Sequence, residues 1–186
     1  MKRMFLFFVL FICFIFFGFA QNVDDFEYRI DQNLGGISIT GYKGSVKDII
    51  IPDRIDGKPV LHIGNGAFQD KQLTSIVIPE SVFSIGVWAF ANNKLTSVKI
   101  PSRITSIGIG TFANNEIVSI TIPYISNIDN GAFANNRLTS VIISDSVERI
   151  GHGAFAGNQI TSVIVPNSVV NLANDAFDAN VTITRE

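Results

Sequence analysis

Apolar residues return along this chain at an almost constant interval. Phenylalanine occurs at positions 68, 90, 112, 133, 155 and 177, with spacings of 22, 22, 21, 22 and 22 residues. Two aliphatic columns keep the same phase, one of Ile or Leu five residues before each Phe and one of Leu or Ile five residues after the first five. A unit with this much fixed apolar content is typical of a solenoid, because each coil can bury its apolar columns only against its neighbours.

Within each unit, a short alternating stretch predicts a strand. In residues 95–100, Val98 and Ile100 alternate with Ser97 and Lys99, which places one pair inward and the other outward. Proline follows at positions 79, 101, 123 and 166, and it ends the strand because it cannot donate a ladder hydrogen bond. The single 21-residue spacing falls between positions 123 and 128. We expect a turn there, since the loss of a residue inside a strand would turn every later side chain to the opposite face.

Asparagine is enriched just after the Phe column. Asn tolerates left-handed backbone, and its amide can bond to backbone groups of a neighbouring turn. We therefore predict a stacked Asn ladder that caps buried backbone, in preference to a ligand site. The residues concerned are at positions 92, 93, 114, 115, 135, 136, 158 and 180.

The two ends of the array differ from its units. Residues 21–45 predict a short N-terminal β cap, because residues 26–30 and 37–39 alternate like strands around a turn at residues 34–36. Residues 181–184 predict a last strand at the other end, with no protection for its outer edge. Self-association through this C-terminal edge is therefore a hypothesis.

The first twenty residues have a composition of their own. They hold eight of the sixteen Phe, both Met and the only Cys, and Lys2 and Arg3 precede their apolar run. Gly18 and Ala20 are the small residues expected just before a cut ahead of Gln21, so residues 1–20 have the layout of a signal peptide. We expect an exported protein, at the cell surface, in the periplasm or outside the cell, with no stable membrane span after cleavage. A retained anchor is the alternative, since an apolar run of 17 residues is at the short limit for a bilayer.

Composition narrows the classes of function. Beyond the leader the chain has no cysteine, which excludes disulfides, thiol catalysis and Cys-ligated metal sites. A net charge of −2 gives no indication of nucleic-acid binding. His62 and His152 are the only histidines, and no nucleophile–base set, metal-ligand pattern or phosphate loop includes them. We therefore expect no enzyme activity, no cofactor and no metal site.

The repeat also resembles a known family. Residues 90–101, with Ser-Ile-Gly and Ala-Phe motifs on either side, are similar to units of the BspA-like leucine-rich repeats, and residues 42–64 are similar to that family's lead-in. The resemblance covers residues 37–180 and implies a leucine-rich-repeat solenoid over residues 46–186. It implies a β-rich fold of five to six stacked coils, each of about 22 residues, with a parallel sheet on the concave face. It also implies a protein partner, because members of the family are surface proteins associated with adhesion to host matrix or to other cells.

The outward positions of the strands form the candidate partner-binding surface. Five coils present one row that is uniformly Ser and a second row that is partly aliphatic. Exposed aliphatic residues in a row favour a contact surface, although β-branched residues also suit strands that contact nothing. The ten positions are Ser75, Val77, Ser97, Lys99, Ser119, Thr121, Ser140, Ile142, Ser162 and Ile164.

Phe83 and Trp88 are possible aromatic anchors for a partner. Trp88 lies in a stretch that varies between units, where other units carry Asn65, Ile109 or His152. Three functions remain open. We favour an exported module that binds a protein through its concave sheet, and the alternatives are a structural or assembly component of the cell envelope and a carbohydrate-binding surface protein. The last would require Phe83 and Trp88 to form one exposed platform.

Overall fold

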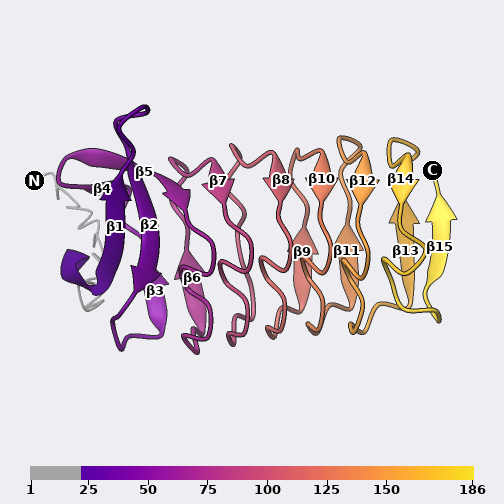
Figure 1. Cartoon of the computed structure of the whole chain (residues 1–186). Coiled ribbons are helices and arrows are strands. Elements are labelled where there is room, and N and C mark those ends of the chain that lie inside the picture. Colours follow the sequence, from indigo (N-terminus) through magenta and orange to yellow (C-terminus); the bar gives the residue numbers. More distant parts are fainter. Residues whose placement is uncertain (1–21) are drawn as a thin grey trace, which may run out of the picture.

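The computed structural model describes residues 22–186 as about seven stacked coils of short strands and turns, arranged side by side along one axis (Figure 1). The predicted signal peptide, residues 1–20, lies outside the described residues. In chain order the elements are the 3-10 helix η1 (Val23–Asp25) and the strands β1 (Phe26–Ile30), β2 (Ile37–Tyr42), β3 (Asp48–Ile50), β4 (Arg54–Ile55), β5 (Lys58–Ile63), β6 (Ser75–Val77), β7 (Ser84–Ile85), β8 (Ser106–Ile107), β9 (Ser119–Thr121), β10 (Asn127–Ile128), β11 (Ser140–Ile142), β12 (Arg149–Ile150), β13 (Ser162–Val165), β14 (Asn171–Leu172) and β15 (Thr182–Arg185).

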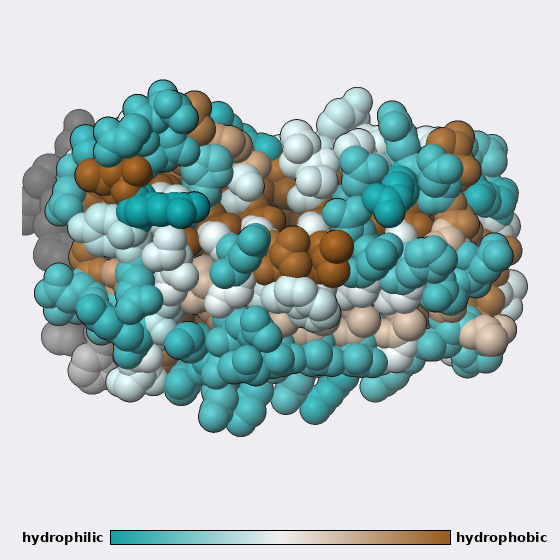
Figure 2. Space-filling view, in the orientation of Figure 1, coloured by the Kyte–Doolittle hydropathy of each residue, from teal (hydrophilic) through white to brown (hydrophobic). Residues whose placement is uncertain are grey.

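Each coil has three sides, and hydrogen bonds join each side to the next coil. On the first side the strands pair in parallel as β3 with β6, β9 with β11, and β13 with β15. On the second side β8, β10, β12 and β14 form a four-stranded parallel sheet, and β5 pairs with β7. The third side carries the Phe column, where the Phe68 N–H donates to the Ala89 carbonyl at 2.8 Å and the later coils repeat this bond. The expected solenoid with parallel sheets is confirmed, and most of the visible surface is polar (Figure 2).

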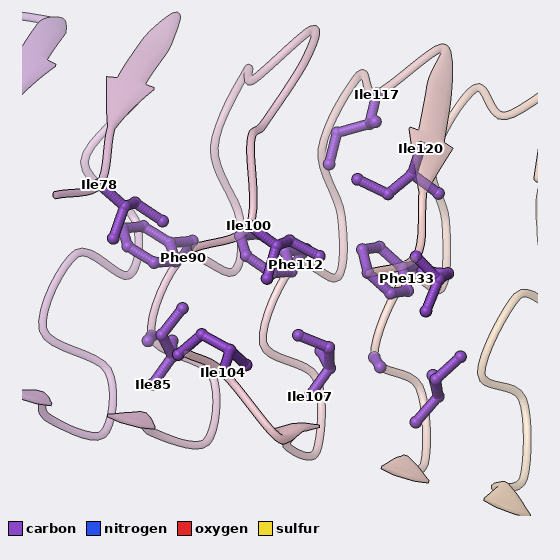
Figure 3. Close-up of a cluster of buried hydrophobic side chains, with 14 of the residues drawn as sticks. Ile78, Ile85, Phe90, Ile100, Ile104, Ile107, Phe112, Ile117, Ile120 and Phe133 are labelled. Carbon is purple, nitrogen blue, oxygen red and sulfur yellow. The ribbon is translucent and has the colours of Figure 1, made fainter. Parts of the chain in front are cut away.

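The phenylalanine column forms one continuous stack inside the solenoid. Successive ring centroids from Phe68 to Phe177 are 5.0 to 5.5 Å apart, with interplanar angles of 5 to 13°. Figure 3 shows Phe90, Phe112 and Phe133 in this row, with Ile side chains of the same coils around them. Such ring pairs contribute about 0.5–1.5 kcal/mol each beyond the area they bury, so the stack fixes the register of the coils.

Asparagine caps the backbone inside the corner that follows Phe90, Phe112, Phe133 and Phe155, as predicted. The Asn115 amide donates to the Phe90, Phe112 and Ala113 carbonyls at 3.0 to 3.2 Å, and its oxygen accepts the Leu95 N–H at 3.1 Å. Equivalent side chains at positions 93, 136 and 158 repeat the pattern. Each amide therefore satisfies buried or partly buried backbone groups of two coils. The predicted cap at Asn180 is wrong: this residue is exposed, and the Asp178 carboxylate accepts the N–H of Gly157 instead.

The shortened unit is accommodated in a turn, as expected. In most coils the N–H three residues after the proline position donates back to its carbonyl, as Val82 does to Pro79 at 3.1 Å. In the shortened unit the donor is Ile125, only two residues after Pro123, at 2.8 Å. The tighter corner compensates for the missing residue. The register of the strands is therefore kept, and β9 pairs with β11 with Ser119 opposite Ser140.

The N-terminal end is covered by an antiparallel hairpin of β1 and β2, and β2 pairs in parallel with β5 of the first coil. Phe26 and Tyr42 close the phenylalanine stack, with ring centroids 6.3 and 5.8 Å from Phe68. The five extra residues of the lead-in form the small hairpin of β4 and β5. Its turn residues, Asp56 and Gly57, have φ of 50 and 73°, the left-handed pair that a tight hairpin turn requires.

One predicted strand does not form. Residues 95–100 have no strand, so the first side is a series of strand pairs and not one unbroken sheet. This segment is instead held to the coil before it by a side chain. The Glu80 carboxylate binds Lys99 Nζ at 2.8 Å and the Ser102 N–H at 2.9 Å. The alternation of burial survives, since Ser97 and Lys99 are exposed and Val98 is half-buried.

Candidate functional site

The ten predicted surface residues lie together on the first side of the coils, and all ten are exposed. Their strand neighbours, such as Ile76, Ile120 and Val163, are buried, so alternation decides which side chains face outward. We call the ten the strand face: Ser75, Val77, Ser97, Lys99, Ser119, Thr121, Ser140, Ile142, Ser162 and Ile164. Whether this side is concave stays a prediction.

Sequence reasoning predicted the last strand, now β15, but missed β3 and left both outer strands out of the candidate surface. Asp48 and Ile50 of β3 lie opposite Ser75 and Val77 of β6, and Thr182 and Thr184 of β15 extend the two rows at the other end. The lead-in hid β3, because its five extra residues break the 22-residue spacing. Alignment on the alternating residues 48–50 alone would have found it.

Aliphatic residues are not spread evenly over the strand face. Ile142 and Ile164, in neighbouring coils, are 66 and 53% exposed, whereas the equivalent positions in the middle of the chain hold Lys99 and Thr121. Val77 is 53% exposed in the coil before Lys99. Figure 2 shows the apolar side chains of the visible surface in separate groups between polar ones.

A groove of about 850 Å³ surrounds the Ile142–Ile164 pair. Its lining includes the hydroxyl side chains of Ser162 and Thr184. Two carboxylates, Asp145 and Glu186, also line it, and none of its lining residues is basic. The groove therefore combines an exposed aliphatic pair with negative charge and hydroxyl groups.

The charged residue of the strand face is already paired. Lys99 Nζ lies 2.8 Å from the Glu80 carboxylate of the coil before it. This hydrogen bond, with those from the N–H and hydroxyl of Ser102, lowers the pKa of the Glu80 carboxyl to about 2. Since the lysine side chain is largely exposed, the pair is a surface ion pair of small energetic value.

Phe83 is half-buried between the side chains of His62 and Arg103. Its ring centroid lies 4.5 Å from that of His62 in an edge-to-face arrangement, and the Arg103 guanidinium carbon lies 5.4 Å from it on the other coil. The ring of Phe83 is therefore already in contact with two side chains of this protein. Within residues 22–186 no ring contact joins Phe83 and Trp88, so the two do not form one platform.

Trp88 occupies the glycine position of its coil, not the variable position predicted from the sequence. Its φ is 58°, and the equivalent residues of four other coils are glycines with φ of 59 to 62°, at positions 66, 110, 131 and 153. The side chain is 41% exposed and lies over Gly110, where a Cβ atom would come within 2.3 Å of the indole ring. Val87, one residue earlier, is the true counterpart of Asn65, Ile109 and His152.

Within residues 22–186, no group of three or more His, Cys, Asp or Glu side chains is arranged to hold a metal ion. No helix in the same part of the chain is long and apolar enough to cross a bilayer. The two histidines lie apart. His152 Nδ1 is 2.8 Å from an Asp175 carboxylate oxygen, and His62 Nε2 is 3.9 Å from Asp31.

The repeat geometry matches a family model. The model of the BspA type leucine rich repeat region matches residues 61–184 in six copies. The chain belongs to this family. A search of the curated proteins found no match.

Solved structures share the fold at low sequence identity. A leucine-rich repeat protein from Bacteroides ovatus is 24% identical with a TM-score of 0.65, over 90% of this chain and 53% of that one. A leucine rich cell surface protein from Faecalibacterium prausnitzii is 24% identical with a TM-score of 0.66, over 87% of this chain and 53% of that one. The T. pallidum leucine-rich repeat protein is 22% identical with a TM-score of 0.65, over 88% of this chain and 85% of that one. The chain thus spans about half the length of the first two.

Membership narrows the class of function. BspA-type leucine-rich repeats are typical of cell-surface proteins and generally serve as scaffolds that bind protein partners without catalysis. A solenoid suits this role, since its stacked coils present a long ordered surface.

Proposed function

We propose that this protein is an exported binding module that captures a protein partner, from host matrix or from a cell surface, through the strand face. The observation that carries the proposal is the exposed aliphatic pair Ile142 and Ile164 beside the groove of about 850 Å³. Exposed aliphatic residues in register on neighbouring coils offer a partner an apolar contact. Export rests on the signal-peptide pattern of residues 1–20, and the choice of matrix or cell-surface partners rests on the family resemblance.

The strand face is suited to binding because its order is set by the core beneath it. Buried residues alternate with the exposed ones along β6, β9, β11 and β13, and the phenylalanine stack holds the coils in register. A surface ordered before binding loses little conformational entropy on docking, so more of the contact energy appears as affinity.

The test replaces the aliphatic pair by Ile142→Asp/Ile164→Asp. Both side chains are more than half exposed, so we expect the variant to fold and to lose capture of proteins from solubilised host matrix or from cell surfaces. The matched control is Val170→Asp/Asn171→Asp, which adds the same charge at the start of β14 and at the residue before it, where both residues line a different depression with Arg149. Capture should be lost in the first variant and kept in the control, as measured by surface plasmon resonance on immobilised matrix. Equal capture by the wild type and the Ile variant would refute the proposal.

Assembly through the C-terminal edge is the second candidate. β15 pairs on one edge with β13, and all four of its residues are exposed. An exposed strand edge is a template for another chain. The N–H groups of Thr182 and Glu186 donate to the coil of β13, so by alternation the N–H of Ile183 faces the outer edge. Ile183→Pro removes this backbone donor, so an oligomer built on the edge should dissociate in sedimentation velocity. A wild-type sedimentation coefficient of a monomer at all concentrations would remove this candidate.

A further inference from the structure

We infer that the groove around Ile142 and Ile164 takes an extended peptide segment in which lysine or arginine lies two residues to either side of an aliphatic residue. The inference rests on the proposed function, because the groove belongs to the strand face, and it adds the chemistry of the partner segment.

Charge is the first argument. Asp145 and Glu186 are both exposed and both line the groove, and no basic residue lines it. Arg185, beside Glu186 in the sequence, does not line the groove, and its guanidinium donates to the Val169 carbonyl at 2.6 Å and lies 3.5 Å from the Pro166 carbonyl. Since no cation among residues 22–186 lines the groove, a lysine or arginine of a partner would complement the two carboxylates.

Shape and hydrophobicity are the second argument. The two isoleucines project from β11 and β13 of neighbouring coils, so they form a short apolar strip that crosses the strands. A volume of about 850 Å³ is in the range of about 300–1,000 Å³ that small ligands and short segments fill. Ser162 and Thr184 border the strip with hydroxyl groups that can bond to a peptide backbone. An aliphatic side chain on the strip with a cation two residues to either side matches this arrangement, because side chains two residues apart in an extended segment point to the same face.

The same features disfavour acidic occupants. An acidic peptide, a nucleic acid or an anionic lipid surface would bring like charge to Asp145 and Glu186. Like charges brought together at an interface oppose binding. A neutral aliphatic segment would use the strip alone and gain nothing from the carboxylates.

The experiment uses three fluorescent octapeptides with blocked ends. Every second residue is serine, and the residues between the serines alternate valine with lysine, with glutamate or with serine, so that valine and the test residue share one face of the extended peptide. Fluorescence anisotropy with the purified protein measures each affinity at low and at high salt. We expect the lysine peptide to bind at least about tenfold more tightly than the glutamate peptide at low salt, with a difference that shrinks as salt screens the carboxylates. Equal binding of the two peptides, or tighter binding of the glutamate peptide, would overturn the inference.

Two variants distinguish the role of the groove carboxylates from the role of the strand face in partner capture. Asp145→Asn/Glu186→Gln should weaken the lysine peptide about fivefold and leave the serine peptide unchanged. The control Asp24→Asn/Glu148→Gln removes two exposed carboxylates outside the groove and should bind like the wild type. If the groove variant keeps full affinity for the lysine peptide while Ile142→Asp/Ile164→Asp loses partner capture, this inference fails and the proposed function stands. If the peptides behave as expected while the Ile variant still captures the partner, the proposed function fails instead.

Discussion

Two adjacent asparagines have different roles in the three corners that hold an Asn-Asn pair. The first of each pair, such as Asn114, has φ of 55 to 57°, and its side chain bonds to the equivalent Asn of the next coil on the surface. The second, such as Asn115, is buried and caps the backbone of two coils. The sequence predicted an Asn ladder with a capping role, but only the structure separates the two positions, because both carry the same residue type.

Asn115→Leu should therefore destabilise the protein. The change leaves the buried Leu95 N–H without its partner, whereas the Phe90 and Phe112 carbonyls keep the amides of Asn93 and Asn136. The free energy of unfolding should fall by about 1–3 kcal/mol, since an orphaned buried group costs about that much. Asn114→Gly is the neighbouring control and should change it by about 0.5 kcal/mol or less in urea denaturation. Equal losses in the two variants would contradict the division of roles.

The left-handed backbone at Trp88 should be detectable from the stabilities of two variants with different residues at this position. Both Trp88→Gly and Trp88→Ala remove the indole from Gly110, but only glycine adopts a φ of 58° without a Cβ penalty. We expect the Gly variant to be about 1 kcal/mol more stable than the Ala variant in urea denaturation, the reverse of the usual order. The same pair of substitutions at Lys94, an exposed residue with negative φ in the same coil, should favour Ala.

At the scale of the elements, corners tolerate changes of length and strands do not. One glycine inserted between Pro123 and Tyr124 restores the 22-residue spacing in the corner that the structure tightens. The same glycine between Ile120 and Thr121 would turn Ile122 outward, although it is buried in the native protein. We expect a cooperative far-ultraviolet melt close to that of the wild type for the first insertion and a large loss of melting temperature for the second. A fold that tolerates both equally would mean that β9 does not set the register.

The ion pair between Glu80 and Lys99 predicts that the stability of the folded protein depends on pH. The pKa of Glu80 is lowered to about 2 in the folded protein, so its ionised form stabilises the fold. This contribution is complete above about pH 4.5, the ordinary pKa of the group, and is lost as the pH falls towards 2. A carbon-13 titration of the Glu80 carboxyl should give a midpoint near 2, and Lys99→Met should move it towards 4.5. A midpoint unchanged by the Lys99 substitution would show that Lys99 does not lower the pKa.

At the scale of the whole molecule, the phenylalanine stack makes the coils cooperative. Phe112 is fully buried between Phe90 and Phe133, with ring centroids 5.4 and 5.5 Å away. Phe112→Ala should lower the free energy of unfolding by about 3–5 kcal/mol, because the cavity interrupts contacts with two coils. Tyr124→Ala, at a ring that is 83% exposed, should change it by about 0.5 kcal/mol or less. Urea denaturation measures both, and a loss in Phe112→Ala no larger than in Tyr124→Ala would contradict a continuous stack.

The sequence by itself determined the period, the buried columns, the strand–turn alternation and the capping by Asn. Each of these is local and is repeated in every unit, so the same pattern could be recognised several times over. Only the tertiary structure decided that Trp88 covers Gly110, that Glu80 holds Lys99, and that Ile142 and Ile164 share a groove with Asp145 and Glu186. These contacts join residues about one or two coils apart that differ from their repeat equivalents, and stacking, not the period, brings such exceptions side by side.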